Sequence, residues 1–63
     1  MKLLEYNTKY IRLTDINGNS YDGYAHYCAK DDYEVEEDGI EMRVDRDIWV
    51  FYESDIKSIE ILD

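Results

Sequence analysis

The sequence has few of the residues that form disulfides, hold metals or cradle phosphates. It contains one cysteine, Cys28, one histidine, His26, three glycines and no proline. A lone cysteine excludes an intrachain disulfide, and a zinc site needs further nitrogen or sulfur ligands. The unpaired thiol predicts a reducing, cytoplasmic setting. No glycine-rich phosphate-binding motif is present, and we expect no metal and no cofactor.

Long hydrophobic runs are also missing. Residues 1–6 are too few and too polar for the hydrophobic part of a secretory signal. No stretch approaches the roughly 20 apolar residues that span a membrane, so we expect no membrane partner. We expect residues 1–63 to form one domain, and a chain of this size buries only about 60% of its unfolded surface. Because neither disulfide nor metal supplements so small a core, we expect a homo-oligomer.

Positive charge is the largest deficit of the chain. Seven Lys and Arg residues face 16 Asp and Glu, which gives a formal net charge of −9. Residues 31–38 read Asp-Asp-Tyr-Glu-Val-Glu-Glu-Asp and contain six acids. These six negative charges equal two thirds of the net charge of −9. Such a segment repels a nucleic-acid backbone and attracts a basic protein surface. We therefore predict that the partner-binding residues are Asp31, Asp32, Tyr33, Glu34, Glu36, Glu37 and Asp38.

Two other interpretations of the acidic segment were weighed against partner binding. A run of like charges often forms only a solvated loop that aids solubility, and this alternative stays open. Tyr33 and Val35 favour a contact surface, because a loop that serves only solubility needs no aromatic side chain. A calcium-binding EF-hand loop does not fit, because the sixth position counted from Asp31 is Glu36 and not glycine.

The alternation of apolar and polar residues predicts a mostly β fold. We expect a short helix within residues 1–8, and then five strands at 9–15, 20–30, 40–44, 48–52 and 56–62. The pair Asn17-Gly18 predicts a tight hairpin turn, and Gly23 allows a bend within the second strand. The side chains expected to point inward are Ile11, Leu13, Ile40, Met42, Val44, Ile59 and Ile61. Neither face of the second strand is clearly apolar.

The run from Ile48 to Tyr52 is apolar at every position, unlike the other strands. This pattern predicts burial on both faces, or burial of one face in an interface. We predict an oligomer interface at Trp49, Phe51 and Tyr52. Core packing is the other interpretation of these aromatic residues, and tyrosine rings around an oligomer axis could also stack a nucleobase.

Leu13-Thr14-Asp15 is followed by Gly18 in the first hairpin and, five positions later, by Gly23 in the second strand. The tail Ile56–Ile61 forms a last strand that a one-turn corner at residues 53–55 introduces. This arrangement resembles the Sm-like (LSm) family of small barrels over roughly residues 1–63. The resemblance implies a five-stranded SH3-like or Sm-like barrel with a short N-terminal helix, which assembles into rings by pairing edge strands.

The RNA-binding residues of the Sm-like family are not matched. Family members that bind RNA carry an aspartate and an asparagine after the second strand, where this chain reads Lys30-Asp31-Asp32-Tyr33-Glu34. The family's second motif joins an arginine to a glycine, whereas Arg46 has no glycine beside it. The resemblance therefore implies the fold of the family without its RNA site.

No catalytic residues are predicted. Asp22, His26 and Cys28 alternate along one face of the second strand, but such arrays arise easily by chance, and we expect structural roles for them. We predict a non-enzymatic inhibitor of the kind that phages and mobile elements encode. It would block a basic, nucleic-acid-binding partner, such as a host defence effector, by imitating nucleic acid. This prediction rests on likeness of size and charge.

Two alternative functions remain. An oligomer could sequester a small nucleotide in pockets lined by tyrosine and by an arginine such as Arg12, Arg43 or Arg46. An Sm-like ring could bind RNA if a basic face forms. The residues of that face would be Lys9, Arg12, Lys30 and Lys57.

Overall fold

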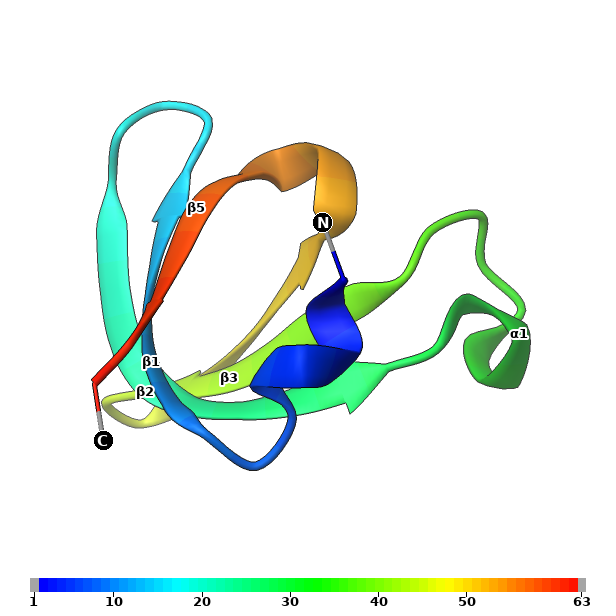
Figure 1. Cartoon of the computed structure of the whole chain (residues 1–63), viewed down its shortest axis with the longest axis horizontal. Helices are drawn as coiled ribbons and strands as arrows, with labels where there is room; N and C mark the ends of the chain where they lie inside the picture. Colours follow the sequence, from blue (N-terminus) through cyan, green and yellow to red (C-terminus); the bar gives the residue numbers. More distant parts are fainter. Residues whose placement is uncertain (1, 63) are drawn as a thin grey trace.

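A computed structural model describes residues 2–62 and contains one five-stranded antiparallel sheet (Figure 1). The strands are β1 (Tyr10–Asp15), β2 (Ser20–Cys28), β3 (Gly39–Val44), β4 (Asp47–Tyr52) and β5 (Ile56–Ile61). Each helical element is a single turn, namely the 3-10 turns η1 (Leu3–Tyr6) and η2 (Glu53–Asp55) and the α-helical turn α1 (Lys30–Tyr33). The predicted mostly β class is confirmed. The helix expected within residues 1–8 is the 3-10 turn η1, and residue 1 lies outside the described residues.

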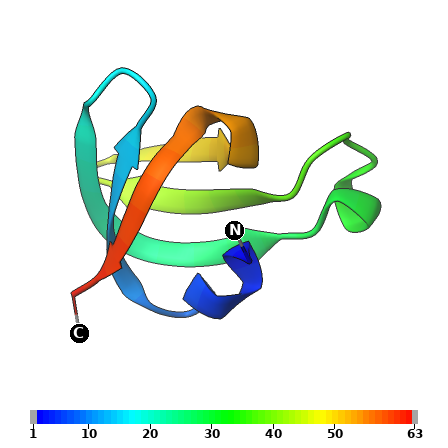
Figure 2. The same ribbon diagram turned by 45° about the horizontal axis from the view of Figure 1, so that its top comes forward.

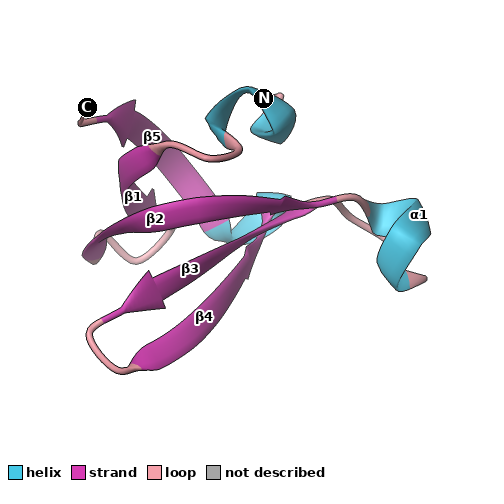
Figure 3. Ribbon diagram, turned by 90° about the horizontal axis from the view of Figure 1, so that it is seen from below, coloured by secondary structure: helices cyan, strands magenta, loops and turns pink. Residues whose placement is uncertain are grey.

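The strand order is β4-β3-β2-β1-β5, so β4 and β5 form the two edges of the sheet (Figure 3). Within residues 2–62 these edges do not pair with each other, and the sheet is not closed. The sheet is nevertheless strongly curved, and β2 bends along its length (Figure 1). Gly23 permits this bend, because a Cβ atom there would lie 2.5 Å from the carbonyl oxygen of Arg43 on β3.

The core lies on the concave face of the sheet. Its fully buried members from β1, β2 and β3 include Ile11, Leu13, Ala25, Ile40 and Met42. Leu3 of η1, Phe51 of β4 and Ile56 of β5 complete the cluster. No charged or polar side chain is buried among residues 2–62. The inward positions predicted for β1 and β3 are confirmed, with Val44 packed against the core as a partly buried member.

The inner face of β2 carries the odd-numbered residues. Gly23 and Ala25 are buried, and Tyr21 and Tyr27 are half-buried against the core. Cys28, at the end of the strand, is also buried although it alternates onto the outer face. Its cover comes from the segment that follows β2.

The last strand differs from its prediction at one position. Ile59 packs against the core as expected, but the prediction that Ile61 points inward is wrong, because Ile61 is 45% exposed. Ile61 pairs with Ile11 at the end of an edge strand, where no further strand lies beside it. The register shift at Thr14/Asp15 instead brings Ile56 into the core.

The first hairpin turns where Asn17-Gly18 predicted, but its loop is longer than a two-residue turn. Gly18 donates its N–H to the carbonyl of Asp15 at 3.0 Å, and Asp15 donates to the carbonyl of Asn19 at 2.8 Å. Gly18 alone takes a positive φ within this loop, at 88°. This combination is typical of a type I turn followed by a left-handed residue, which accommodates the twist of the strands.

Candidate interaction site

The acidic segment joins β2 to β3 and projects beyond the ends of these strands (Figure 2). It begins as α1, and Glu34 ends this turn in the left-handed conformation with φ of 54°. The N–H of Val35 closes the turn by donating to the carbonyl of Lys30 at 3.1 Å. The segment predicted to be a loop is therefore partly helical, and it follows the second strand as expected.

Two of the predicted partner-binding acids fix the segment to the body of the protein. The Glu37 carboxylate accepts hydrogen bonds from the backbone N–H of Ser54 at 2.8 Å and from its hydroxyl at 2.9 Å. The Asp38 carboxylate accepts the N–H of Lys30 at 2.9 Å, and its backbone carbonyl accepts the N–H of Glu53 at 3.1 Å. The bonds to Ser54 and Glu53 tie the base of the loop to η2, and the bond to Lys30 joins the two ends of the loop.

The remaining four acids are exposed and form what we call the acidic tip: Asp31, Asp32, Glu34 and Glu36. Among residues 2–62 no hydrogen bond or ion pair engages their carboxylates. Tyr33 lies among them and is 56% exposed. The predicted residues are thus adjacent in space, but they divide into an anchor, Glu37 and Asp38, and an exposed tip.

The negative charge of the segment acts on the two nearest tyrosines. A hydrogen bond with the Cys28 thiol raises the pKa of Tyr33, and the charges of Glu41 and Asp32 add to this rise. Burial raises the pKa of Tyr27, and the neighbouring Asp38 carboxylate raises it further. Both shifts favour the neutral phenol, chiefly through the Cys28 hydrogen bond for Tyr33 and through burial for Tyr27, and nearby carboxylates make a smaller contribution to each.

A small pocket lies between the acidic segment and the outer face of the sheet. Its volume is about 100 Å³, and it is lined by Cys28, Tyr33, Val35, Glu41, Val50 and Tyr52. A Cβ atom on Gly39 would lie 3.4 Å from the Tyr52 ring, so this glycine leaves room for the ring to lie against β3. No motif in the sequence predicts this pocket, because its lining comes from four separate elements.

The predicted oligomer interface divides between core and surface. Phe51 is only 6% exposed and belongs to the core, while Trp49 and Tyr52 are 43% and 37% exposed. The Trp49 ring packs at 5.5 Å from that of Tyr21 and stacks at 6.2 Å on that of Phe51. Burial of the run on both faces is excluded within the monomer, because Phe51 is the single buried residue of β4. The interface itself stays a prediction.

No family model, curated protein or solved structure matches this chain. Its function is therefore inferred from its own residues. No helix within residues 2–62 is long and apolar enough to cross a membrane. Across the same residues, no group of three His, Cys, Asp or Glu side chains is placed to hold a metal ion.

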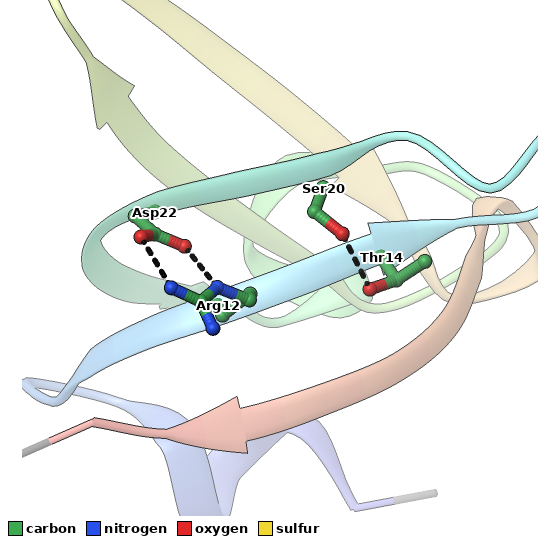
Figure 4. A network of polar contacts seen from close by, with 4 residues as sticks. All are labelled: Arg12, Thr14, Ser20 and Asp22. Atoms are coloured by element: carbon green, nitrogen blue, oxygen red, sulfur yellow. Dashed lines mark hydrogen bonds and ion pairs between the residues drawn. The ribbon is translucent and has the colours of Figure 1, made fainter.

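Two of the side chains considered for other chemistry, Arg12 and Asp22, are partners of each other. Arg12 and Asp22 form a bidentate ion pair across β1 and β2, with N–O distances of 2.8 and 3.0 Å (Figure 4). The pair raises the pKa of Arg12 and lowers that of Asp22. Asp22 therefore pairs with Arg12 and not with His26, and a nucleotide phosphate would have to compete with Asp22 for Arg12. Beside this pair, the hydroxyls of Thr14 and Ser20 lie 3.0 Å apart.

Proposed function

We propose that this protein is a non-enzymatic binding protein whose acidic tip docks onto a basic surface of a protein partner. The observation that supports this proposal is that the acids of residues 31–38 fall into two groups, one hydrogen-bonded to the body of the protein and one exposed. Glu37 and Asp38 hold the loop in place, while the four acids of the tip and Tyr33 are exposed. A loop that served only solubility would need no such anchor, and a fixed charge pattern favours recognition.

The partner that suits this surface best is a basic, nucleic-acid-binding protein. Carboxylates spaced along the loop can occupy sites that bind phosphates, and the exposed Tyr33 ring can occupy a site that stacks a base. Electrostatic attraction speeds such an encounter, and the net charge of −9 opposes binding to nucleic acid itself. We infer an inhibitor of the phage or mobile-element type that occupies the nucleic-acid site of a host defence effector.

We also infer that the curved sheet is a small barrel of the Sm-like or SH3-like type. The strand order, the bend of β2 at Gly23 and the one-turn corner η2 before β5 support this inference. The unpaired edge of β4 supports assembly into a homo-oligomer. Ile48, Trp49 and Val50 are all exposed there, and an exposed apolar edge strand pairs readily with another chain.

A capture experiment tests the proposed function. The immobilised protein is offered to a panel of purified basic nucleic-acid-binding proteins at low salt and in about 0.5 M salt, which screens charge over a few ångströms. We expect capture of a partner at low salt, reduced capture at high salt, and competition by duplex DNA for the partner. A captured partner that duplex DNA does not displace would contradict imitation of nucleic acid.

A further inference from the structure

The pocket between the acidic segment and β4 combines aromatic, apolar and acidic side chains. Tyr33 and Tyr52 supply aromatic rings to the pocket lining from two separate elements, one on α1 and the other at the end of β4. Val35 and Val50 supply apolar surface, and Glu41 supplies a carboxylate. No hydrogen bond or ion pair within residues 2–62 engages the Glu41 carboxylate.

These groups suit a positively charged ligand with an apolar stem. Aromatic rings attract ammonium groups through their negative faces, and a partly desolvated carboxylate strengthens that attraction. A neutral ligand would leave Glu41 without a partner, and an anion would be repelled by Glu41 and the acidic tip. Since one water takes about 30 Å³ of liquid volume, a pocket of about 100 Å³ holds three or four heavy atoms. An ammonium group with its last methylene groups fills that space.

We propose that this pocket binds the ammonium end of a lysine side chain that the basic partner presents. The inference rests on the proposed function and names the group that the site recognises. The acidic tip attracts the basic surface over a distance, and the pocket holds one lysine of that surface between Tyr33 and Tyr52, with its charge at Glu41. A guanidinium is a poorer fit by size, because its planar group has four heavy atoms and leaves no room in the pocket for the stem that carries it.

A titration with small model compounds tests the pocket without the partner. Nα-acetyl-lysine methylamide is added to the labelled protein, and the methyl resonances of Val35 and Val50 are followed by NMR. We expect saturable shifts at these methyls. The norleucine analogue has the same stem without the charge, and the arginine analogue carries a guanidinium. Shifts of equal size and affinity with norleucine would overturn the cation site, and tighter binding of arginine would overturn the choice of lysine.

Variants locate the binding within the pocket. We expect Glu41→Gln to weaken lysine binding by about fivefold or more, and Tyr33→Leu to do the same, while Tyr33→Phe keeps the ring and the affinity. Glu60→Gln removes an exposed carboxylate on β5, at the other edge of the sheet, and should leave the affinity within about twofold. Equal effects of Glu41→Gln and Glu60→Gln would contradict the pocket, because they would show a general effect of charge.

The two proposals fail in distinguishable ways. If partner capture needs the acidic tip but is unchanged by Glu41→Gln and Tyr33→Leu, the lysine pocket is wrong and the proposed function stands. If the lysine compound binds the pocket but no basic protein is captured, the proposed function is wrong and the ammonium site stands.

Discussion

At the scale of single residues, two glycines mark close contacts between neighbouring strands. A Cβ atom on Gly23 would lie 2.5 Å from the carbonyl oxygen of Arg43, closer than such atoms approach in folded proteins. A Cβ atom on Gly39 would lie 3.2 Å from the carbonyl oxygen of Phe51. The first contact allows β2 to curve, and the second allows Tyr52 to lie along β3. Packing therefore requires glycine at position 23, and at position 39 a side chain would press on β4.

Replacement of Gly23 should be more damaging than replacement of a turn glycine. We expect Gly23→Ala to lower the free energy of unfolding by about 2 kcal/mol or more, because the sheet must open to admit the methyl group. Gly18→Ala, at φ of 88° with no atom within 4 Å of the new Cβ, should lower it by about 1 kcal/mol. Urea denaturation of both variants measures the difference. Equal losses would contradict the close approach at Gly23.

Asp15 predicts a pH dependence of stability. Its carboxylate accepts the backbone N–H groups of Asn17 and Asn19, both at 2.9 Å, and these bonds lower its pKa, with a smaller contribution from the Tyr21 hydroxyl. A lowered pKa stabilises the fold above the ordinary aspartate value near 3.9, and this stabilisation is lost as the pH falls through the folded value. Asp15→Asn should therefore be less stable at pH 6 and lose less stability on acidification. Identical pH slopes in the two proteins would rule out this role.

At the scale of elements, the acidic segment depends on bonds that reach far along the chain. The Glu37 carboxylate accepts a hydrogen bond from Ser54, which lies 17 positions further along the chain. No sequence motif links these two residues. We expect Glu37→Ala to speed hydrogen exchange of the amides in residues 30–38, because the loop loses two hydrogen bonds to η2. Glu36→Ala removes the neighbouring exposed acid and should leave exchange unchanged. Equal exchange in both variants would mean that Glu37 does not anchor the loop.

We predict that the protein forms homo-oligomers through its edge strand β4. Its free edge exposes Ile48, which is 59% exposed and lies outside both the core and the lysine pocket. We expect the protein to sediment as an oligomer and Ile48→Lys to shift it toward the monomer, since charged side chains on an edge strand oppose pairing. Ile16→Lys places the same charge on a comparably exposed isoleucine of the first hairpin loop and serves as the control. Oligomers that persist in Ile48→Lys would contradict pairing through β4.

Comparison of the predicted strands and turns with the structure shows which elements the sequence could predict. Alternation identified β1 and β3 with their inward residues, because an inner and an outer face alternate strictly along a strand. Alternation failed at Ile61, where the position at the edge of the sheet decides exposure. Turn preference placed the first hairpin correctly at Asn17-Gly18 but not its length, because the Asp15 carboxylate supports a longer loop. The pocket was missed because its residues meet only after α1 is placed against β4.

At the scale of the whole molecule, the proposed function requires that the position of the negative charge matters and not only its amount. Six of the 16 acids lie within residues 31–38, and two of these six, Glu37 and Asp38, hold the loop in place through hydrogen bonds. The four acids of the tip remain for a partner. If position matters, removal of these four should weaken binding far more than removal of four acids elsewhere, although the net charge of the two variants is equal.

The affinity of two matched variants for the captured partner tests this claim most directly. In one variant the four acids of the acidic tip are replaced by the corresponding amides, Asn for Asp and Gln for Glu. In the other variant the same replacements are made at four exposed acids outside the segment, namely Glu5, Asp45, Asp47 and Glu60. Calorimetry at constant salt should show that the tip variant loses at least about tenfold in affinity, or 1.4 kcal/mol, and that the second variant stays within about threefold of the wild type. Equal losses in the two variants would contradict a specific acidic tip and would reduce the interaction to net charge alone.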